Sequence, residues 1–491
     1  MSMKSGTGAV GWVLWFASAA LLLACSGGHE PYDDLYAQPT GGSTNGGSTG
    51  AGGSAGTSGV TFHKDVEPIV QVSCQGCHTV GGLAPFSLTT YQAARPWASL
   101  MASQTSARLM PPWGAQDTSE CKPPFPWKTD ARLSDKDIAT IAAWAAAGAP
   151  EGDPNDAPPP RVPPPSDLPG ATIELVPRQP FTTGGTADQF RCFVLDDPRL
   201  ALGAYVNGIH VIPGNATVVH HAVVSTDPNG EASKLAGPDG SFECSSAGGG
   251  TPREGQVILE VWTPGYMPIE LPSNMAMPIV PGSKLIMQVH YSPAGRTAAT
   301  DSTRVQLRLA TTKPEYLLFT TAVGNFEKAL TGGDGLLAGP NDATAVPEFR
   351  IPSNTGGHVE RMQFTMPVPE TPRPVFYLYG VMAHEHLAGV DVKIDLAKAT
   401  TPDQDICLLQ DRWDFHWQRM YAYEAPVTSL PTLDTGDKIK LRCTYDNTME
   451  NPRLREVLVS VGRTATNDIY LGESTLDEMC LVIPQIVIRH P

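Results

Sequence analysis

Basic residues are scarce in this 491-residue sequence, in which 34 lysines and arginines stand against 50 acidic residues and the net charge is −16. No basic cluster is present to neutralise phosphates, which excludes nucleic acid and an anionic membrane surface as binding partners. Charged residues make up only 17% of the chain, whereas glycine and proline are abundant, with 48 and 46 copies. This composition predicts many short strands joined by turns, and the length suggests about three domains.

Long hydrophobic runs are also lacking, apart from one between Val10 and Ala24. That run is too short for a stable membrane span, and the small residues at its end are typical of a processed secretory signal. It ends in "LLLAC", which resembles a bacterial lipobox and implies cleavage before Cys25 and attachment of lipid to the Cys25 thiol. We therefore expect residues 1–25 to be a lipoprotein signal peptide, with an uncleaved membrane anchor as the alternative.

The predicted location is the bacterial cell envelope, with the protein anchored by lipid. Ser26, which follows the lipobox cysteine, favours the outer membrane over the inner one. The body of the protein then faces the periplasm or the cell surface, an oxidising compartment in which disulfides persist.

Two segments have a composition that cannot bury a core. Residues 26–59 include a Gly/Ser/Thr-rich stretch, which predicts a disordered tether. Residues 151–170 are rich in proline and predict a semi-rigid, extended linker with a rise of about 3.1 Å per residue. Between them, residues 60–150 predict one small helical domain, and a further region begins at residue 171.

The end of the first domain carries a strong helix signal. Ser134 and Asp137 form a capping box, Ile141 and Trp144 lie on one helical face, and Gly148 ends the pattern. This pattern predicts that a helix closes the domain at its C-terminal end.

The stretch "CQGCH" contains Cys74, Cys77 and His78 in the C-x-x-C-H pattern of a c-type haem attachment site. Two thioethers then hold the porphyrin and the histidine binds one axial position of the iron. Met110 lies 32 residues further on, on an extended loop next to proline, and is the candidate for the sixth ligand. Met101, in a run that looks helical, is interpreted as a core residue.

Short runs with a period of two residues dominate the chain after residue 170. They include "KLIMQVHYS", "TRVQLRLA", "VFYLYGVMA" and "REVLVSVG", each bounded by Gly, Pro, Asn or Asp. This pattern predicts an all-β region, and its length predicts two sandwich domains, residues 171–325 and 326–491.

Six cysteines remain after Cys25 and the haem pair are set aside. An even number in an oxidising compartment favours disulfides, although six cysteines allow 15 pairings and the sequence does not choose among them. They are Cys121, Cys192, Cys244, Cys407, Cys443 and Cys480.

Only 12 histidines occur in the chain, and five of them lie in apolar, strand-like runs. These five are His220, His221, His290, His384 and His386. Burying imidazoles without partners is costly, so a metal is the economical explanation. Imidazole-rich sites without clustered thiolates favour copper or zinc, and a thioether such as that of Met479 favours copper. Adjacent residues on a strand point to opposite faces, so His220 and His221 can share one metal only if their strand is bent or ends there.

Four motifs in order, "VVHHAVV", "QVHY", "HEH" and "DEMC", resemble the copper type II, ascorbate-dependent monooxygenases. This family includes peptidylglycine α-hydroxylating monooxygenase and dopamine β-monooxygenase. The resemblance covers about residues 170–489 and implies two jelly-roll sandwiches. The fold class expected is therefore multidomain, a small all-α cytochrome c domain followed by two all-β jelly-roll sandwich domains.

The resemblance also implies the copper ligands. His220, His221 and His290 would bind an electron-storing copper, and His384, His386 and Met479 would bind the copper at which dioxygen is activated and a hydrogen atom is taken from the substrate. The two sites would face one another across a wide, solvent-filled cleft. Cys443 and Cys480 match a family disulfide.

The sequence departs from peptide-hydroxylating members at the positions that hold the peptide carboxylate. Met382, Leu481 and Ile483 stand there, and none can pair with a carboxylate, which argues against peptide amidation and for an apolar pocket. Glu385 is the one candidate for binding an amine. The aromatic stretch 411–421 either lines a pocket or packs a strand with His416 in a turn.

The leading hypothesis is a copper-dependent monooxygenase with two copper ions and one covalent haem c. It uses O2 to hydroxylate a C–H bond of a small, apolar substrate, with electrons supplied by the fused haem or by an external donor. The alternative is a cell-envelope electron carrier or copper-binding lipoprotein without oxygenase activity. A zinc hydrolase has only Glu385 as a general base.

Overall fold

The computed structural model describes residues 59–80, 84–161, 167–184, 189–244, 256–263, 267–291, 298–340, 342, 346–367, 374–472 and 474–490. The predicted signal peptide with its lipidated Cys25, and nearly all of the predicted tether, lie outside these residues. No helix among them is long and apolar enough to cross a membrane.

The chain divides into two compact units, one helical and one built of strands. The helical unit comprises Pro31–Trp113 and Ala131–Pro164, and the β unit includes Gly114–Asp130 and Pro165–Pro491. The described residues form mostly β-sheet with few helices, which is consistent with the predicted β-sandwich domains. The predicted domain boundaries and the jelly-roll connectivity stay predictions.

The helical unit surrounds a core that includes Phe62, Val70, Ile141 and Trp144, all fully buried. As the sequence predicts, Ser134 caps the last long helix by accepting a hydrogen bond from the backbone N–H of Asp137 at 3.1 Å. The elements are η1 (Phe62–Val66), α1 (Glu67–Ser73), α2 (Tyr91–Ala94), η2 (Arg95–Trp97), α3 (Ala98–Ser106), α4 (Asp135–Ala146) and η3 (Pro154–Asp156).

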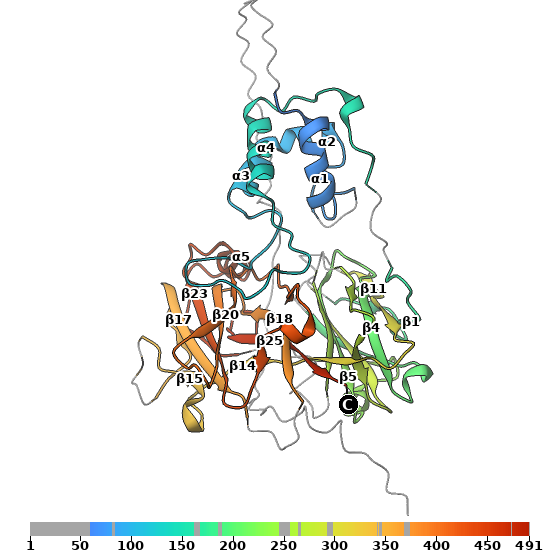
Figure 1. Ribbon diagram of the computed structural model, residues 1–491, viewed down its shortest axis with the longest axis vertical. Coiled ribbons are helices and arrows are strands. Elements are labelled where there is room, and N and C mark those ends of the chain that lie inside the picture. The colour runs from blue at the N-terminus through green and yellow to red at the C-terminus, as the bar shows by residue number, and fades with distance from the viewer. Residues whose placement is uncertain are drawn as a thin grey trace, which may run out of the picture. The chain divides into compact units, whose positions relative to one another are not determined.

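One 11-stranded sheet runs through the whole β unit, and Figure 1 shows its strands β18 and β25 in the middle of that unit. Its order is β1 (Ile173–Leu175), β12 (Arg304–Leu309), β4 (Ala204–Ile212), β9 (Met275–Ile279), β13 (Tyr316–Thr320), β25 (Leu481–Arg489), β18 (Phe376–His384) and β21 (Tyr421–Ala422). Three short strands attach to it: β8 (Ile269–Glu270), β14 (Val323–Gly324) and β22 (Thr432–Leu433). The two predicted sandwiches therefore share one continuous sheet.

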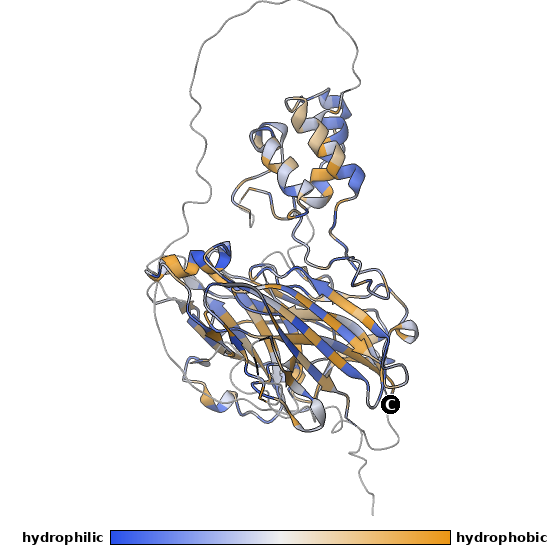
Figure 2. Ribbon diagram, turned by 90° about the vertical axis from the view of Figure 1, so that its left-hand side faces the viewer, coloured by the Kyte–Doolittle hydropathy of each residue, from blue (hydrophilic) through white to orange (hydrophobic). Residues whose placement is uncertain are grey.

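Two five-stranded sheets complete the layers. The first has the order β6 (Ser241–Glu243), β3 (Gln189–Leu195), β10 (Lys284–Tyr291), β5 (Val219–Asp227) and β7 (Ile258–Trp262), and its β7 contacts β4 and β13. The second has the order β15 (Gly335–Leu337), β17 (Thr355–Thr365), β23 (Lys438–Asn447), β19 (Gly389–Ala397) and β20 (Asp405–Asp411), and β19 and β20 contact β18. Hydrophobic and hydrophilic residues alternate along many strands (Figure 2), as expected for strands with one buried face.

The remaining elements are short. Two-stranded sheets pair β2 (Phe181–Thr182) with β11 (Thr300–Asp301) and β16 (Arg350–Ile351) with β24 (Ile469–Tyr470). Single turns of 3-10 helix are η4 (Pro198–Leu200), η5 (Ser233–Leu235), η6 (Thr331–Gly333) and η7 (Val427–Ser429).

The run "REVLVSVG" is helical, so its prediction as a strand was wrong. It belongs to α5 (Pro452–Ser460), which begins because the Asn451 side chain accepts hydrogen bonds from two backbone N–H groups and Pro452 occupies the first turn. Leu454 and Leu458, four residues apart, are the buried residues of this helix. The alternation that predicts a strand is thus overridden by the N-terminal cap.

A segment between the two helical parts of the chain, Gly114–Asp130, belongs to the β unit. We call it the strap. The strap is joined to β20 by a disulfide between Cys121 and Cys407 and by a bridge of Ala115 with Asp411. A further bridge pairs Trp127 with Tyr423, the residue after β21. A side-chain carbon at Gly114 would collide with the Asp411 carboxylate, so only glycine fits at this crossing.

Candidate metal centres and haem site

Three histidines of adjacent strands meet at one point. His290 on β10 lies opposite His221 on β5, and a β-bulge falls between His290 and Tyr291, because Tyr291 pairs with Val219 and leaves His220 as the extra residue. A bulge re-aims the side chain of the extra residue. The irregularity explains how two adjacent residues, His220 and His221, contribute to one cluster.

The three Nδ1 atoms form an equilateral triangle, because each is 3.3 Å from the other two. A point equidistant from all three lies about 1.9 Å from each, close to the roughly 2.0–2.1 Å of a zinc–imidazole bond. Burial, followed by the nearby His290 and His220, lowers the pKa of His221 well below its ordinary value. A neutral imidazole is the form that binds metal, so these residues fit a copper ion.

The second pair, His384 and His386, is oriented by hydrogen bonds at Nδ1. His384 Nδ1–H donates to Gln418 Oε1 at 2.9 Å, and His386 Nδ1–H donates to the Asp477 carbonyl at 3.1 Å. Both Nε2 atoms therefore carry the lone pair that a metal needs. Burial lowers the pKa of both imidazoles, that of His386 to about 3, which keeps them neutral.

Met479 is held next to this pair through Glu478. Oε2 of Glu478 accepts the backbone N–H of His386 at 2.8 Å and that of Met479 at 3.1 Å, so one atom joins the two backbones. Tyr445 OH also donates to the Met479 carbonyl at 2.7 Å. A disulfide joins Cys443 and Cys480, the pair that the family resemblance implies.

A loop between β20 and β21, residues 412–420, contacts both histidine groups. His416 Nδ1 is 3.3 Å from His220 Nε2, the Phe415 ring is stacked on that of His220, and Gln418 is the partner of His384. The sequence singled out this aromatic stretch but assigned no role to His416 or Gln418. Burial and the Arg453 guanidinium lower the pKa of His416 to about 4.

Glu385 does not face an open site. The side chain is fully buried, and a side chain at Gly389 would collide with its carboxylate. Burial raises the pKa of Glu385 well above its ordinary value, with Glu478 adding to the shift. These features speak against Glu385 as an amine-binding group and against the zinc hydrolase that would use it as a base.

The C-x-x-C-H residues lie in the helical unit, where the sequence predicts a haem site. His78 Nδ1–H donates to the Phe86 carbonyl at 3.1 Å, which leaves Nε2 for iron. Cys74 and Cys77 form no disulfide, whereas the other six cysteines of the described residues are paired, including Cys192 with Cys244. Burial, with Cys77 adding to it, raises the pKa of Cys74 to about 12, so its thiol is protonated.

Apolar side chains next to these candidates are exposed. Val72 is 76% exposed, Val80 85% and Leu109 45%; each is within two residues of Cys74, His78 or Met110. Met110 itself is half-buried at the end of the loop after α3. Met101, by contrast, is buried in α3, as its interpretation as a core residue predicts.

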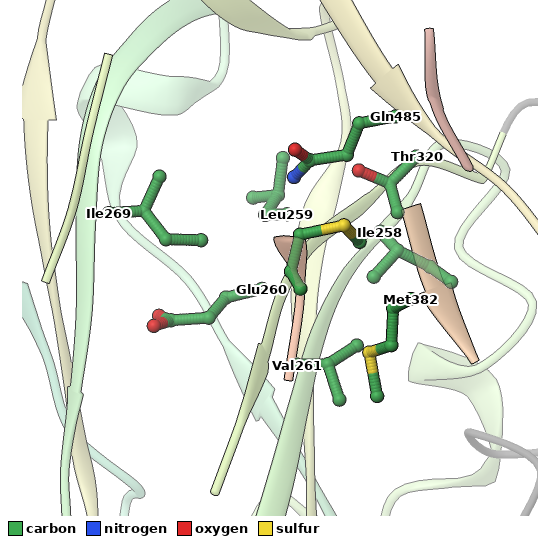
Figure 3. Close-up of a pocket in the computed structure, with 9 residues that line it drawn as sticks. Ile258, Leu259, Glu260, Val261, Ile269, Thr320, Met382 and Gln485 are labelled. Carbon is green, nitrogen blue, oxygen red and sulfur yellow. The ribbon is translucent and has the colours of Figure 1, made fainter. Parts of the chain in front are cut away.

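A small cavity in the β unit is lined by residues of its N-terminal half (171–325) and of its C-terminal half (326–491). Figure 3 shows Glu260 and Val261 of β7, Ile269 of β8, Thr320 of β13 and Met382 of β18 around it. It has room for about one water molecule. Met382 lies opposite Ile483 in the pairing of β18 with β25, and both side chains are buried. Two of the three positions that replace the family's carboxylate-binding residues are therefore core positions.

Residues 341–483 match the model of the family "Copper type II ascorbate-dependent monooxygenase, C-terminal domain". The matched region includes His384, His386 and Met479. A search of curated proteins finds no match.

Two solved structures match part of this chain with low scores. The major capsid protein P2 from Bacteriophage PM2 is 10% identical with a TM-score of 0.25, covering 65% of this chain and 98% of its own. Peptide-N(4)-(N-acetyl-β-D-glucosaminyl) asparagine amidase is 10% identical with a TM-score of 0.26, covering 66% of this chain and 97% of its own. Scores this low establish no shared fold.

Proposed function

We propose that the protein is a copper-dependent monooxygenase that uses O2 to hydroxylate a C–H bond of a small, apolar substrate. The observation that carries the proposal is the Nδ1 triangle of His220, His221 and His290, together with a second group in a region that matches a copper monooxygenase family. Two separate groups of ligands, one made of imidazoles alone and one with a thioether, support two copper ions with different roles.

Each group would hold one copper. His220, His221 and His290 would bind the ion that stores an electron, and His384, His386 and Met479 the ion that supplies the redox chemistry for activating dioxygen. The chain's own residues orient these ligands: Gln418 and the Asp477 carbonyl fix the two imidazoles of the second site, and Glu478 fixes the backbone of Met479.

The helical unit is proposed to be a cytochrome c domain that supplies the electrons. Haem held by Cys74, Cys77, His78 and Met110 would supply one-electron redox chemistry. Because both units are on one chain, tethering raises the local concentration of the donor toward the millimolar range. An external reductant would then be needed only to refill the haem.

The protein is further proposed to act in the bacterial cell envelope, anchored by lipid at Cys25. Haem attachment to C-x-x-C-H and the formation of three disulfides both fit an oxidising compartment.

Copper content and product mass test the proposed function. The full-length protein, reconstituted with copper, is expected to bind two copper ions and to add one oxygen atom to an apolar compound from a screened panel, read by mass spectrometry. Met479→Ala should abolish the product while the three-histidine copper is retained. A protein that binds no copper, or one whose electron transfer proceeds unchanged in Met479→Ala without any oxygenated product, would support the electron-carrier alternative instead.

Stopped-flow spectroscopy tests the electron supply. Reoxidation of the ferrous haem should accelerate when Cu(II) is loaded and slow again in a His290→Ala protein. Equal rates in the copper-free, copper-loaded and His290→Ala samples would show that the haem serves another acceptor.

A further inference from the structure

His416 reaches the three-histidine site from the opposite half of the β unit. It lies in the loop 412–420, between β20 and β21, whereas His220 is on β5. His416 Nδ1 is 3.3 Å from His220 Nε2, and the two rings are perpendicular, with centroids 5.6 Å apart. Phe415 covers the face of the same His220 ring at 5.6 Å.

The nitrogen of His220 that His416 contacts determines which ring donates the hydrogen bond and which accepts it. Nδ1 of His220 faces the other two histidines, so a metal would bind there and the proton would lie on Nε2. The Nε2–H group then has His416 Nδ1 within reach as an acceptor. The partner at the far nitrogen of a metal-bound histidine sets its tautomer, its ring orientation and its basicity.

The loop that carries His416 is fixed at several points. Asp414 Oδ1 accepts the backbone N–H of His416 at 3.0 Å, and the Asp414 carboxylate is paired with Arg453 at 2.8 Å. Trp413 Nε1–H donates to the His386 carbonyl at 2.9 Å. His416 is therefore presented to His220 by a loop that is also bonded to the second site.

We propose that His416 is a positioning residue of the three-histidine copper site, accepting the Nε2–H of His220. This inference rests on the proposed copper function. It adds a residue from the C-terminal half to a site whose ligands all belong to the N-terminal half. The loop 412–420 thereby contacts both sites, because its Gln418 accepts a hydrogen bond from His384 in the same way.

Three variants of the full-length chain separate the hydrogen bond from simple packing. His416→Leu and His416→Phe remove the acceptor, the second while keeping a ring in place. His416→Asn keeps an acceptor atom bonded to Cγ, where Nδ1 stands. His490→Leu is the matched control, since His490 is also partly buried and hydrogen-bonded, to Tyr205 OH at 3.1 Å and the Pro314 carbonyl at 3.0 Å, away from both sites.

The measurement is a Cu(I) titration against a competing chelator, in which His290→Ala identifies the step that belongs to the three-histidine site. That step should weaken 10–100-fold in His416→Leu and His416→Phe, the range seen when such partners are removed. It should stay within about threefold of the parent in His416→Asn and His490→Leu. Pulsed EPR of the Cu(II) form should show a large change in the remote-nitrogen coupling in the Leu and Phe variants, a smaller one in His416→Asn, where an oxygen replaces the accepting nitrogen, and none in His490→Leu.

The outcomes distinguish the two proposals. A parent protein that binds no copper overturns the proposed function. A parent with two binding steps, of which the His290-dependent one is unchanged in both the Leu and the Phe variants, overturns the role of His416 alone. A loss in the Leu and Phe variants that Asn does not restore also overturns it, since packing would then explain the effect. Should the Leu and Phe chains fail to fold, the remote-nitrogen coupling in His416→Asn decides. Asn accepts the hydrogen bond with an oxygen in place of a nitrogen, so a coupling identical to that of the parent would contradict the hydrogen bond.

Discussion

A single carboxylate, that of Glu478, organises the second histidine site. Oε2 accepts the N–H groups of His386 and Met479, and Oε1 accepts those of Ala388 and Gly389 at 2.7 and 3.2 Å. An amide in the same place has only one oxygen, so its NH2 group would face two N–H donors.

Glu478→Gln should therefore lower the free energy of unfolding by about 1–3 kcal/mol, the cost of leaving buried donors unsatisfied. It should also weaken copper binding at the His384 site while sparing the three-histidine site. Denaturant unfolding and copper titration check both effects, with the exposed Glu231→Gln as control. Equal stability and copper affinity in Glu478→Gln would contradict this role.

Asp411 predicts a pH dependence of stability. Burial raises its pKa from an ordinary value of 3.8 to about 7, although the Tyr421 hydroxyl donates a hydrogen bond that opposes the shift. Between about pH 4 and 7 the folded chain keeps this proton and the unfolded chain loses it. The unfolded state thus binds fewer protons, and the free energy of unfolding falls as the pH rises, by up to about 1.4 kcal/mol per pH unit.

Asp411→Asn should remove this contribution, because the amide does not ionise and still offers an oxygen to Tyr421. Unfolding curves at several pH values between 4.5 and 7.5 measure the slope, with the exposed Asp403→Asn as control. A slope that is the same in all three proteins would refute the assignment to Asp411.

At the scale of the element, the disulfide between Cys443 and Cys480 links β23 to the residue before β25 and stands next to Met479. Replacing both cysteines by serine opens a link across 37 residues and should cost about 3–4 kcal/mol of stability. Copper at the Met479 site should be lost as well.

The disulfide between Cys192 and Cys244 provides the comparison, because it spans a similar 52 residues. Its serine variant should lose similar stability yet keep copper at the Met479 site. Thermal unfolding measures the loss of overall stability in the two variants, and copper content measures the loss of the Met479 site. Equal copper loss in both variants would argue against a specific role for Cys480.

The sequence predicts those features that depend on neighbouring residues. The Ser134 cap of α4 and the His-x-His pair at the end of β18 are of this kind, whereas the C-x-x-C-H haem site stays a prediction. The bulge at His220 cannot be read in the same way, because it is defined by the register of β5 against β10, about 70 residues away. The helix α5 was missed because its cap outweighs its alternation, and His416 because its partner lies 196 residues earlier.

At the scale of the molecule, the strap connects the helical unit to the β unit a second time. The chain passes through the strap at Gly114–Asp130, returns to the helical unit and leaves it again at Pro164. Cys121 of the strap is bonded to Cys407, 286 residues further along the chain. The chain therefore passes between the two units at the ends of the strap as well as through the proline-rich linker.

Cleavage of the chain in residues 151–170 should not separate the fragments. The first contains Cys121 and the second Cys407, so one band is expected on a non-reducing gel and two after reduction. Limited proteolysis of the parent and of Cys407→Ser makes the test, and two bands from the parent without reductant would contradict the disulfide.

The place of β25 in the long sheet has a consequence for biosynthesis. Residues 481–489 lie between β13 and β18, so neither strand has its full set of partners until this segment has been synthesised. At about 5–20 residues per second, many seconds pass between the emergence of β13 and that of β25. During that interval two unpaired strand edges are open to association with other chains. Folding of this protein should accordingly depend on chaperones that shield the incomplete β unit until its closing strand has been synthesised.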